Sequence, residues 1–122
     1  MNDSDRESVR DILECIEAID RAESAQRRLP DDPDVWRVAL EVVRHSLLTI
    51  EGAVRSLSLE LCEDHPAVPW SEMARIADLI GPADDKLDPQ SVRASIGQPL
   101  RQLRTACRAI VGESVRIGED EP

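Results

Sequence analysis

Hydrophobic residues recur at intervals of three and four along almost the whole chain, which is the spacing of an amphipathic helix. The first such run extends to about Arg28 and stops at Leu29-Pro30. Ser4 is expected to cap this helix, with Glu7 completing a capping box. The positions expected to be buried are Val9, Ile12, Leu13, Ile16 and Ile19.

The second run has the most regular spacing in the chain. Asp32 followed by Pro33 predicts an N-cap with proline in the first turn, and the helix is expected to reach about Ser58. Its apolar positions form a heptad pattern: Trp36, Leu40, Val43, Leu47, Ile50, Val54 and Leu57. This pattern suits a coiled coil or an antiparallel bundle. Val35 and Val42 widen the apolar face, which favours the bundle.

A short helix is expected in the second half of the chain. Pro66 and Pro69 frame an irregular link, Ser71 is expected to cap the helix, and Gly81-Pro82 to end it. The apolar positions of this helix are Met73, Ile76, Leu79 and Ile80.

The last helix is opened by Asp88 and Pro89, which repeat the earlier cap chemistry. Its buried positions are expected to be Val92, Ile96, Leu100, Leu103, Cys107 and Ile110. Pro99 would cost a straight helix about 3 kcal/mol, so two helical pieces are expected to meet near residues 97–99. The pattern therefore predicts an all-α fold, an antiparallel bundle of four to five helices, with one domain over residues 1–115 and an acidic flexible tail over residues 116–122.

Composition agrees with a small helical domain. The chain has 122 residues, 41% of them hydrophobic, but only 2% aromatic and none of them Phe or Tyr, which favours packed helices over a sheet. The net charge of -10 disfavours attraction to nucleic acid or an anionic membrane, although a local basic face could override it. Arg101, Arg104 and Arg108 form such a segment. Without aromatic stacking residues nearby, a solvated face is favoured over an RNA-binding or acidic-partner surface.

Cysteine usage and the lack of targeting signals point to the cytoplasm. Cys15, Cys62 and Cys107 are odd in number and widely spaced, which suits neither a disulfide framework nor a paired-ligand zinc site. Cys62 and His65 have half the spacing of a zinc site but no second pair, so no metal and no cofactor are expected. No signal peptide or membrane span is indicated.

Four short motifs follow one another in a definite order. They are RDIL at residues 10–13, IEGA at 50–53 followed by Leu57-Ser58, HPAVPW at 65–70, and Pro99-Leu100. Together they resemble the HepT-like branch of the HEPN family, small all-helical proteins typified by ribonuclease toxins. The resemblance covers roughly residues 8–112 and implies a HEPN-like bundle that forms a homodimer.

The resemblance fails at the family's catalytic positions. In that family, the helix after the tryptophan carries an arginine, a polar residue and, further on, a histidine, which cleave RNA without metal. Here Ala77 falls at the arginine position, Asp78 keeps the polar character, and Gly81 or Pro82 falls at the histidine position. The chain also has no Tyr, the residue that a nucleotidyltransferase partner modifies in some members.

RNA cleavage through the 2'-hydroxyl needs a proton carrier with a near-neutral pKa and a cation that stabilises charge on phosphorus. Ala77 and Gly81 supply neither. Arg44 and His45 are the available substitutes, but adjacent helical residues point about 100° apart and would not converge on one phosphate. These substitutions argue against the family's enzymatic activity.

The resemblance therefore implies a catalytically degenerate HepT-like HEPN domain that acts through protein contacts. It would be derived from, or part of, a toxin–antitoxin-type system with a nucleotidyltransferase-type partner. Two alternatives remain: an active ribonuclease toxin with displaced catalytic residues, and an unrelated helical binding module. Independently of the family, Trp36, Val42 and Leu48 give the second helix more apolar surface than one neighbour would cover, which favours a dimer.

Overall fold

The computed structural model describes residues 1–81 and 87–119, with side chains of the last helix described as far as residue 112. Every regular element in those residues is helical. The elements are α1 (Asp3–Arg28), α2 (Pro33–Arg55), α3 (Leu59–Asp64), α4 (Trp70–Met73), the 3₁₀ helix η1 (Ile76–Ile80) and α5 (Pro89–Glu119). The expected tail at residues 116–122 begins inside α5, and its last three residues lie outside the described part. The predicted all-α bundle is confirmed.

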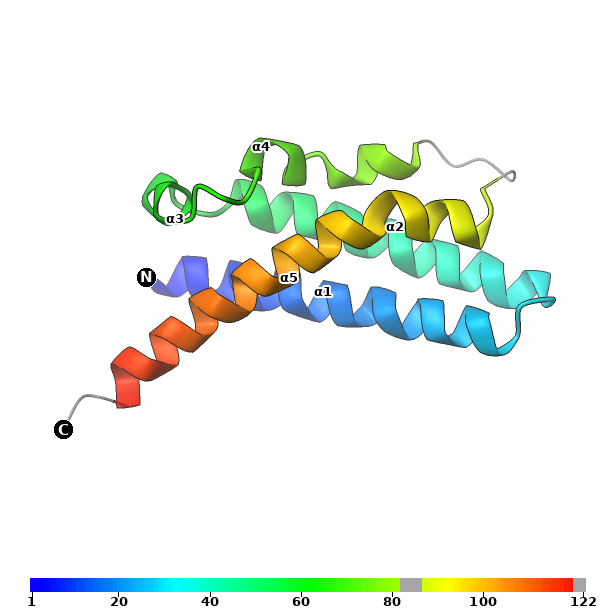
Figure 1. Ribbon diagram of the computed structural model, residues 1–122, viewed down its shortest axis with the longest axis horizontal. Helices are drawn as coiled ribbons and strands as arrows, with labels where there is room; N and C mark the ends of the chain where they lie inside the picture. Colours follow the sequence, from blue (N-terminus) through cyan, green and yellow to red (C-terminus); the bar gives the residue numbers. More distant parts are fainter. Residues whose placement is uncertain (82–86, 120–122) are drawn as a thin grey trace.

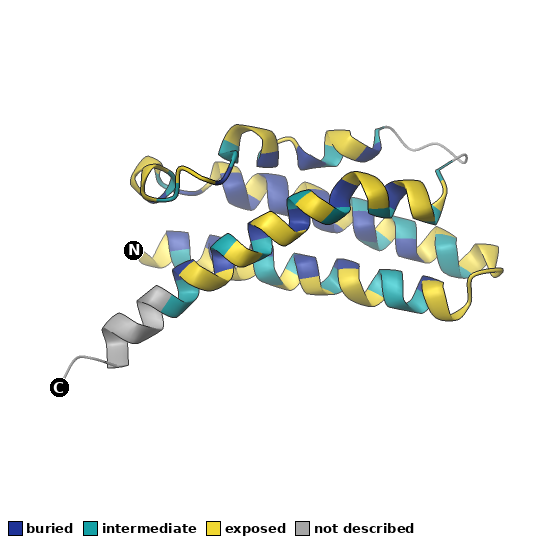
Figure 2. Ribbon diagram, in the orientation of Figure 1, coloured by how far each residue is buried: buried dark blue, intermediate teal, exposed yellow. Residues whose placement is uncertain are grey.

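Two long helices form the frame of the bundle (Figure 1). α1 and α2 run antiparallel as a hairpin, and α5 crosses them obliquely. The chain between α2 and α5 returns along α2 as α4 and η1, and η1 packs against both α2 and α5. The buried residues face the space enclosed by these elements (Figure 2).

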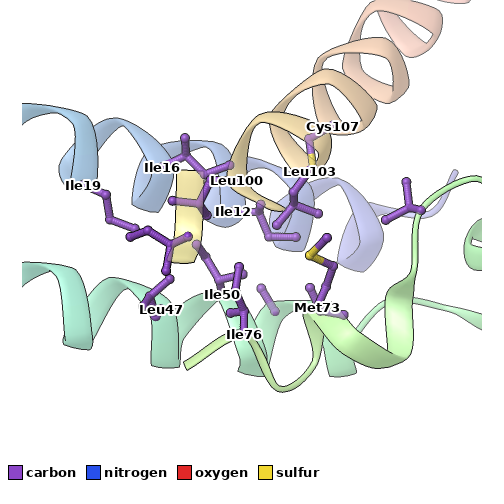
Figure 3. Close-up of a cluster of buried hydrophobic side chains, with 14 of the residues drawn as sticks. Ile12, Ile16, Ile19, Leu47, Ile50, Met73, Ile76, Leu100, Leu103 and Cys107 are labelled. Carbon is purple, nitrogen blue, oxygen red and sulfur yellow. The ribbon is translucent and has the colours of Figure 1, made fainter. Parts of the chain in front are cut away.

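The core is almost wholly aliphatic, as the composition predicts. Ile12 and Ile16 of α1, Leu47 and Ile50 of α2, and Leu103 of α5 are fully buried and point toward one another (Figure 3). Most of the positions expected to be buried are confirmed. The exceptions are the half-buried residues Leu13, Trp36 and Leu40 and the exposed residue Leu79.

The N-cap predicted for the first helix was wrong. Ser4 lies inside α1, and Asn2 is the cap, because its side-chain oxygen accepts a hydrogen bond of 2.7 Å from the backbone N–H of Asp5. The caps predicted at Asp32 and Asp88 are confirmed, since each carboxylate accepts hydrogen bonds from backbone N–H groups of the following turn.

The end predicted for the second helix also needs correction. α2 ends at Arg55, because Ser58 caps the separate helix α3, which the periodicity did not predict. The Ser58 hydroxyl accepts a bond of 3.2 Å from the N–H of Leu61. The buried carboxylate of Asp5 in turn accepts bonds from the Ser58 N–H at 2.8 Å and from its hydroxyl at 2.6 Å. The start of α3 is thereby fixed to the start of α1.

The short helix expected from residue 71 starts differently. Its first helical residue is Trp70, with Pro69 at the N-cap position and no side-chain cap, so Ser71 is not the cap. Backbone carbonyls bind three N–H groups of the first turn instead: Val68 accepts from Trp70, and Pro69 accepts from Glu72 and Met73.

This segment is also two short helices instead of one. The chain leaves the α-helix at Ala74 and Arg75, and the Ala74 carbonyl accepts a hydrogen bond of 2.9 Å from Arg55 Nη2. Gly81 ends η1 with a φ of 66°, a conformation that side chains other than glycine rarely adopt. Pro82, the second half of the expected stop, lies outside the described residues.

The break expected at Pro99 does not occur, because α5 continues through it as one helix. Pro99 removes the donor to the Ser95 carbonyl, and its ring lies against that carbonyl. Ile96 and Leu100 on either side are both buried in the same core, and their packing holds the helix on one path.

Replacing Pro99 with Ala should therefore stabilise the protein. The change restores a backbone donor to a helix that is already continuous through the site, so the free energy of unfolding should rise by about 1–3 kcal/mol. Urea unfolding followed by circular dichroism measures the change, with the exposed neighbour substitution Gln98→Ala as the control. A loss of stability in Pro99→Ala would show that packing of the proline ring outweighs the missing hydrogen bond.

Candidate functional site

A hollow of about 580 Å³ opens between α2 and η1. We refer to it as the α2–η1 hollow; its described lining residues are Arg44, Leu48, Glu51, Ala77, Asp78, Ile80 and Gly81. The three residues from α2 are spaced by four and three, so they share one helix face. The hollow therefore brings together the three degenerate motif positions and one of the two proposed substitutes.

Arg44 joins the two sides of this hollow. Its side chain is half-buried, and Nη1 donates a hydrogen bond of 3.1 Å to the carbonyl oxygen of Gly81. The guanidinium thus lies beside the residue that falls at the family's histidine position, and Ala77, at the arginine position, lines the same space. A cation is present near the expected site, although it comes from a different helix.

His45 is not brought into the hollow. Its side chain is exposed and is not among the described lining residues, while its neighbour Arg44 is. The difference follows from the rotation of about 100° between adjacent helical residues. The two proposed substitutes therefore do not act on a common point.

Two carboxylates also line the hollow. The side chain of Glu51 is 10% exposed and is paired with Arg55 at 3.8 Å between Oε2 and Nη2, a separation beyond hydrogen-bond length. Arg55 is mostly exposed, and the same Nη2 donates to the Ala74 carbonyl. Asp78 is exposed and pairs with Arg75 at 3.5 Å. Exposed pairs of this kind contribute about 0–1 kcal/mol.

Neither Glu51 nor Leu48 was predicted from the sequence to line a site, although Glu51 belongs to the IEGA motif and Leu48 was expected to contribute to a dimer surface. The signal was available, because residues 44, 48 and 51 follow the helical spacing that puts them on the face of α2 that Arg44 occupies. What the sequence could not supply was the position of η1 opposite that face.

The HPAVPW motif has a structural role. The indole N–H of Trp70 donates a bond of 3.0 Å to the His65 carbonyl, closing the loop that the motif forms. Val68 in the middle of this loop is buried against the core. These contacts position α4, and through it η1, along α2.

The three arginines of the basic segment of α5, Arg101, Arg104 and Arg108, lie in different surroundings. Arg104 is mostly buried and pairs with Asp20 of α1, whereas Arg101 and Arg108 are exposed. The solvated face expected from the sequence therefore includes two of the three arginines. The third stabilises the contact between α5 and α1.

The three cysteines are free thiols. Cys15 and Cys62 are half-buried, and burial raises the pKa of the Cys107 thiol to about 12. Among the described residues, no group of three or more His, Cys, Asp and Glu side chains is arranged to hold a metal ion. In the same part of the chain, no helix combines the length and apolar character needed to cross a membrane.

The hollow thus offers one guanidinium, two carboxylates and an apolar wall. Its described lining residues include no histidine that could move a proton at neutral pH. The carboxylates would also repel a phosphate group.

No protein-family model, curated protein or solved structure matches this chain. The resemblance to HepT-like proteins rests on the short motifs alone.

The cysteines should differ in reactivity toward a disulfide reagent such as DTNB. At about pH 8, Cys15 and Cys62 should react first and Cys107 last, because the thiolate is the nucleophile and the buried thiol stays protonated. Absorbance of the released thiolate gives the rates. In urea all three should react together, and Cys107→Ala should remove the slow phase. A single fast phase in the native protein would contradict the burial of Cys107.

Proposed function

We propose that this chain is a catalytically degenerate HepT-like HEPN domain that acts through protein contacts. It belongs to, or derives from, a cytoplasmic toxin–antitoxin-type system with a nucleotidyltransferase-type partner. The observation that carries the proposal is the α2–η1 hollow, where Arg44 faces the residues at the family's catalytic positions without a histidine beside it among the described lining residues.

Charge supports a role other than RNA cleavage. Glu51 and Asp78 line the hollow with Arg44, so its carboxylates outnumber its guanidinium among the described residues. The chain as a whole carries a formal charge of -10, which opposes the approach of a polyanion. A phosphate at Arg44 would be repelled by the two lining carboxylates and by the net negative charge of the chain.

Purified protein should therefore leave RNA intact. Incubation of a labelled RNA with the protein in EDTA should give no cleavage above the buffer control, and Arg44→Ala and His45→Ala should change nothing, because the described lining residues include no histidine that could move a proton at neutral pH. Arg37→Ala, an exposed α2 residue paired with Asp34, serves as the matched variant. Cleavage that disappears in Arg44→Ala or His45→Ala would establish the alternative, a ribonuclease with displaced catalytic residues.

The proposal includes a homodimer. A second hollow of about 420 Å³ lies between α1 and α2 and is lined almost entirely by apolar side chains: Ala22, Ala25, Asp34, Val35, Val38, Ala39 and Val42. Val38 is 57% exposed. The sequence favoured a dimer on the basis of Trp36, Val42 and Leu48. Of these residues, Val42 lines the second hollow and Leu48 is exposed elsewhere on α2. Trp36 is half-buried instead, and its indole N–H donates a hydrogen bond of 2.9 Å to the Leu87 carbonyl.

Light scattering at micromolar concentration should return twice the chain mass of 13.6 kDa. Val38→Asp should shift the mass to that of one chain, because a carboxylate would be buried in an apolar contact. Leu59→Asp changes an exposed leucine that does not line the second hollow, and it should leave the mass unchanged. A wild-type mass of one chain would remove the dimer from the proposal.

A further inference from the structure

The carboxylate of Glu51 is unusual in being both nearly buried and weakly compensated. Its side chain is 10% exposed, and within the described residues its polar partner is Arg55 at 3.8 Å. Arg55 is 62% exposed and also donates to the Ala74 carbonyl. A buried carboxylate normally accepts short, charge-assisted hydrogen bonds. The open space beside Glu51 is where a further donor fits.

The charges around this space select the sign of the ligand. Glu51 and Asp78 contribute two negative charges to the lining. Arg44 contributes one positive charge, and its Nη1 donates to the Gly81 carbonyl. Each carboxylate also has an arginine partner outside the lining, Arg55 for Glu51 and Arg75 for Asp78, but both arginine side chains are mostly exposed and solvent weakens these pairs. A cation inside the hollow therefore still gains from the lining carboxylates, whereas an anion would have to displace the contact of Arg44 with Gly81.

The walls of the hollow select the shape of the ligand. Leu48, Ala77 and Ile80 give it an apolar lining, and Leu48 is 60% exposed at its edge. An aliphatic stem that ends in an ammonium group satisfies both features, because the methylenes cover the apolar wall while the charge reaches the carboxylate.

We propose that the α2–η1 hollow binds a lysine side chain presented by a partner protein. The ammonium donates hydrogen bonds to the Glu51 carboxylate, the stem lies along Leu48 and Ile80, and Asp78 adds attraction at the edge. A protein source follows from the exposed Leu48, which a neighbouring protein surface covers and a free amine does not. The net charge of -10 attracts basic partners at long range. The inference rests on the proposed function, since it names the chemistry of the protein contact.

The test is an NMR titration of the ¹⁵N-labelled protein with the peptide acetyl-Leu-Lys-Leu-amide. Saturable shifts should occur at amides of residues 44–51 and 76–81, with a dissociation constant in the range of about 0.1–10 mM that is usual for a small ligand. The peptide with norleucine in place of lysine should bind about tenfold more weakly, because it lacks the ammonium. Butylamine should also bind more weakly than the lysine peptide, because its short chain covers only part of the exposed Leu48 side chain.

Variants separate the contribution of Glu51 from general effects. Glu51→Gln should weaken peptide binding about tenfold. Glu41→Gln removes an exposed carboxylate of the same helix that does not line the hollow, and it should bind as the wild type does. Leu48→Ser keeps the charges and should weaken the peptide more than it weakens butylamine, because the leucines of the peptide also cover Leu48. This variant tests the proposal even if Glu51→Gln disturbs folding.

Several outcomes would overturn the inference. They are no saturable shift with the peptide, equal binding of the norleucine peptide, full binding in Glu51→Gln, and tighter binding of butylamine than of the peptide. Shifts at the same amides with inorganic phosphate, lost in Arg44→Ala, would assign the hollow to anions instead. None of these results depends on RNA cleavage, so failure here and failure of the proposed function are told apart.

Discussion

The structure depends on close packing between helices that carry no large aromatic side chains in their shared core. Without Phe or Tyr, branched aliphatic residues of α1, α2, η1 and α5 must meet directly to exclude water, since each buries a modest area. Ile12, Ile50, Ile76 and Leu103 come from all four elements and meet in one cluster. This requirement keeps α5 continuous at Pro99 and draws the short helix η1 onto α2.

The long helices could be predicted from the sequence because their signals are local. The Asp32 and Asp88 caps and the heptad spacing of α2 each act within a few residues, and the structure confirms both caps and the burial of the heptad positions Val43, Leu47, Ile50 and Val54. The errors occur where a distant residue decides the outcome. Ser58 begins a new helix because Asp5 holds it, and the chain breaks beside Ala74, whose carbonyl is bound by Arg55. Periodicity contains no information on such contacts.

The site could be predicted only in part for the same reason. Motif spacing placed Ala77, Asp78 and Gly81 at one location, and it offered Arg44 as a substitute on another helix. That Arg44 reaches Gly81 depends on how closely η1 approaches α2, which is a tertiary property. Glu51 was missed because a carboxylate on a helix face is usually solvated, and only packing reveals that this one is nearly buried.

The bond between Asp5 and Ser58 links residues 53 positions apart. α3 has only six residues and is too short to be stable by itself, so its cap must be in place for it to form. Ser58 has that geometry only when the first turn of α1 is docked. The first turn of α1 and helix α3 therefore form a single cooperative unit. Fraying of the first turn of α1 releases α3 as well, and α3 folds only after that first turn has docked.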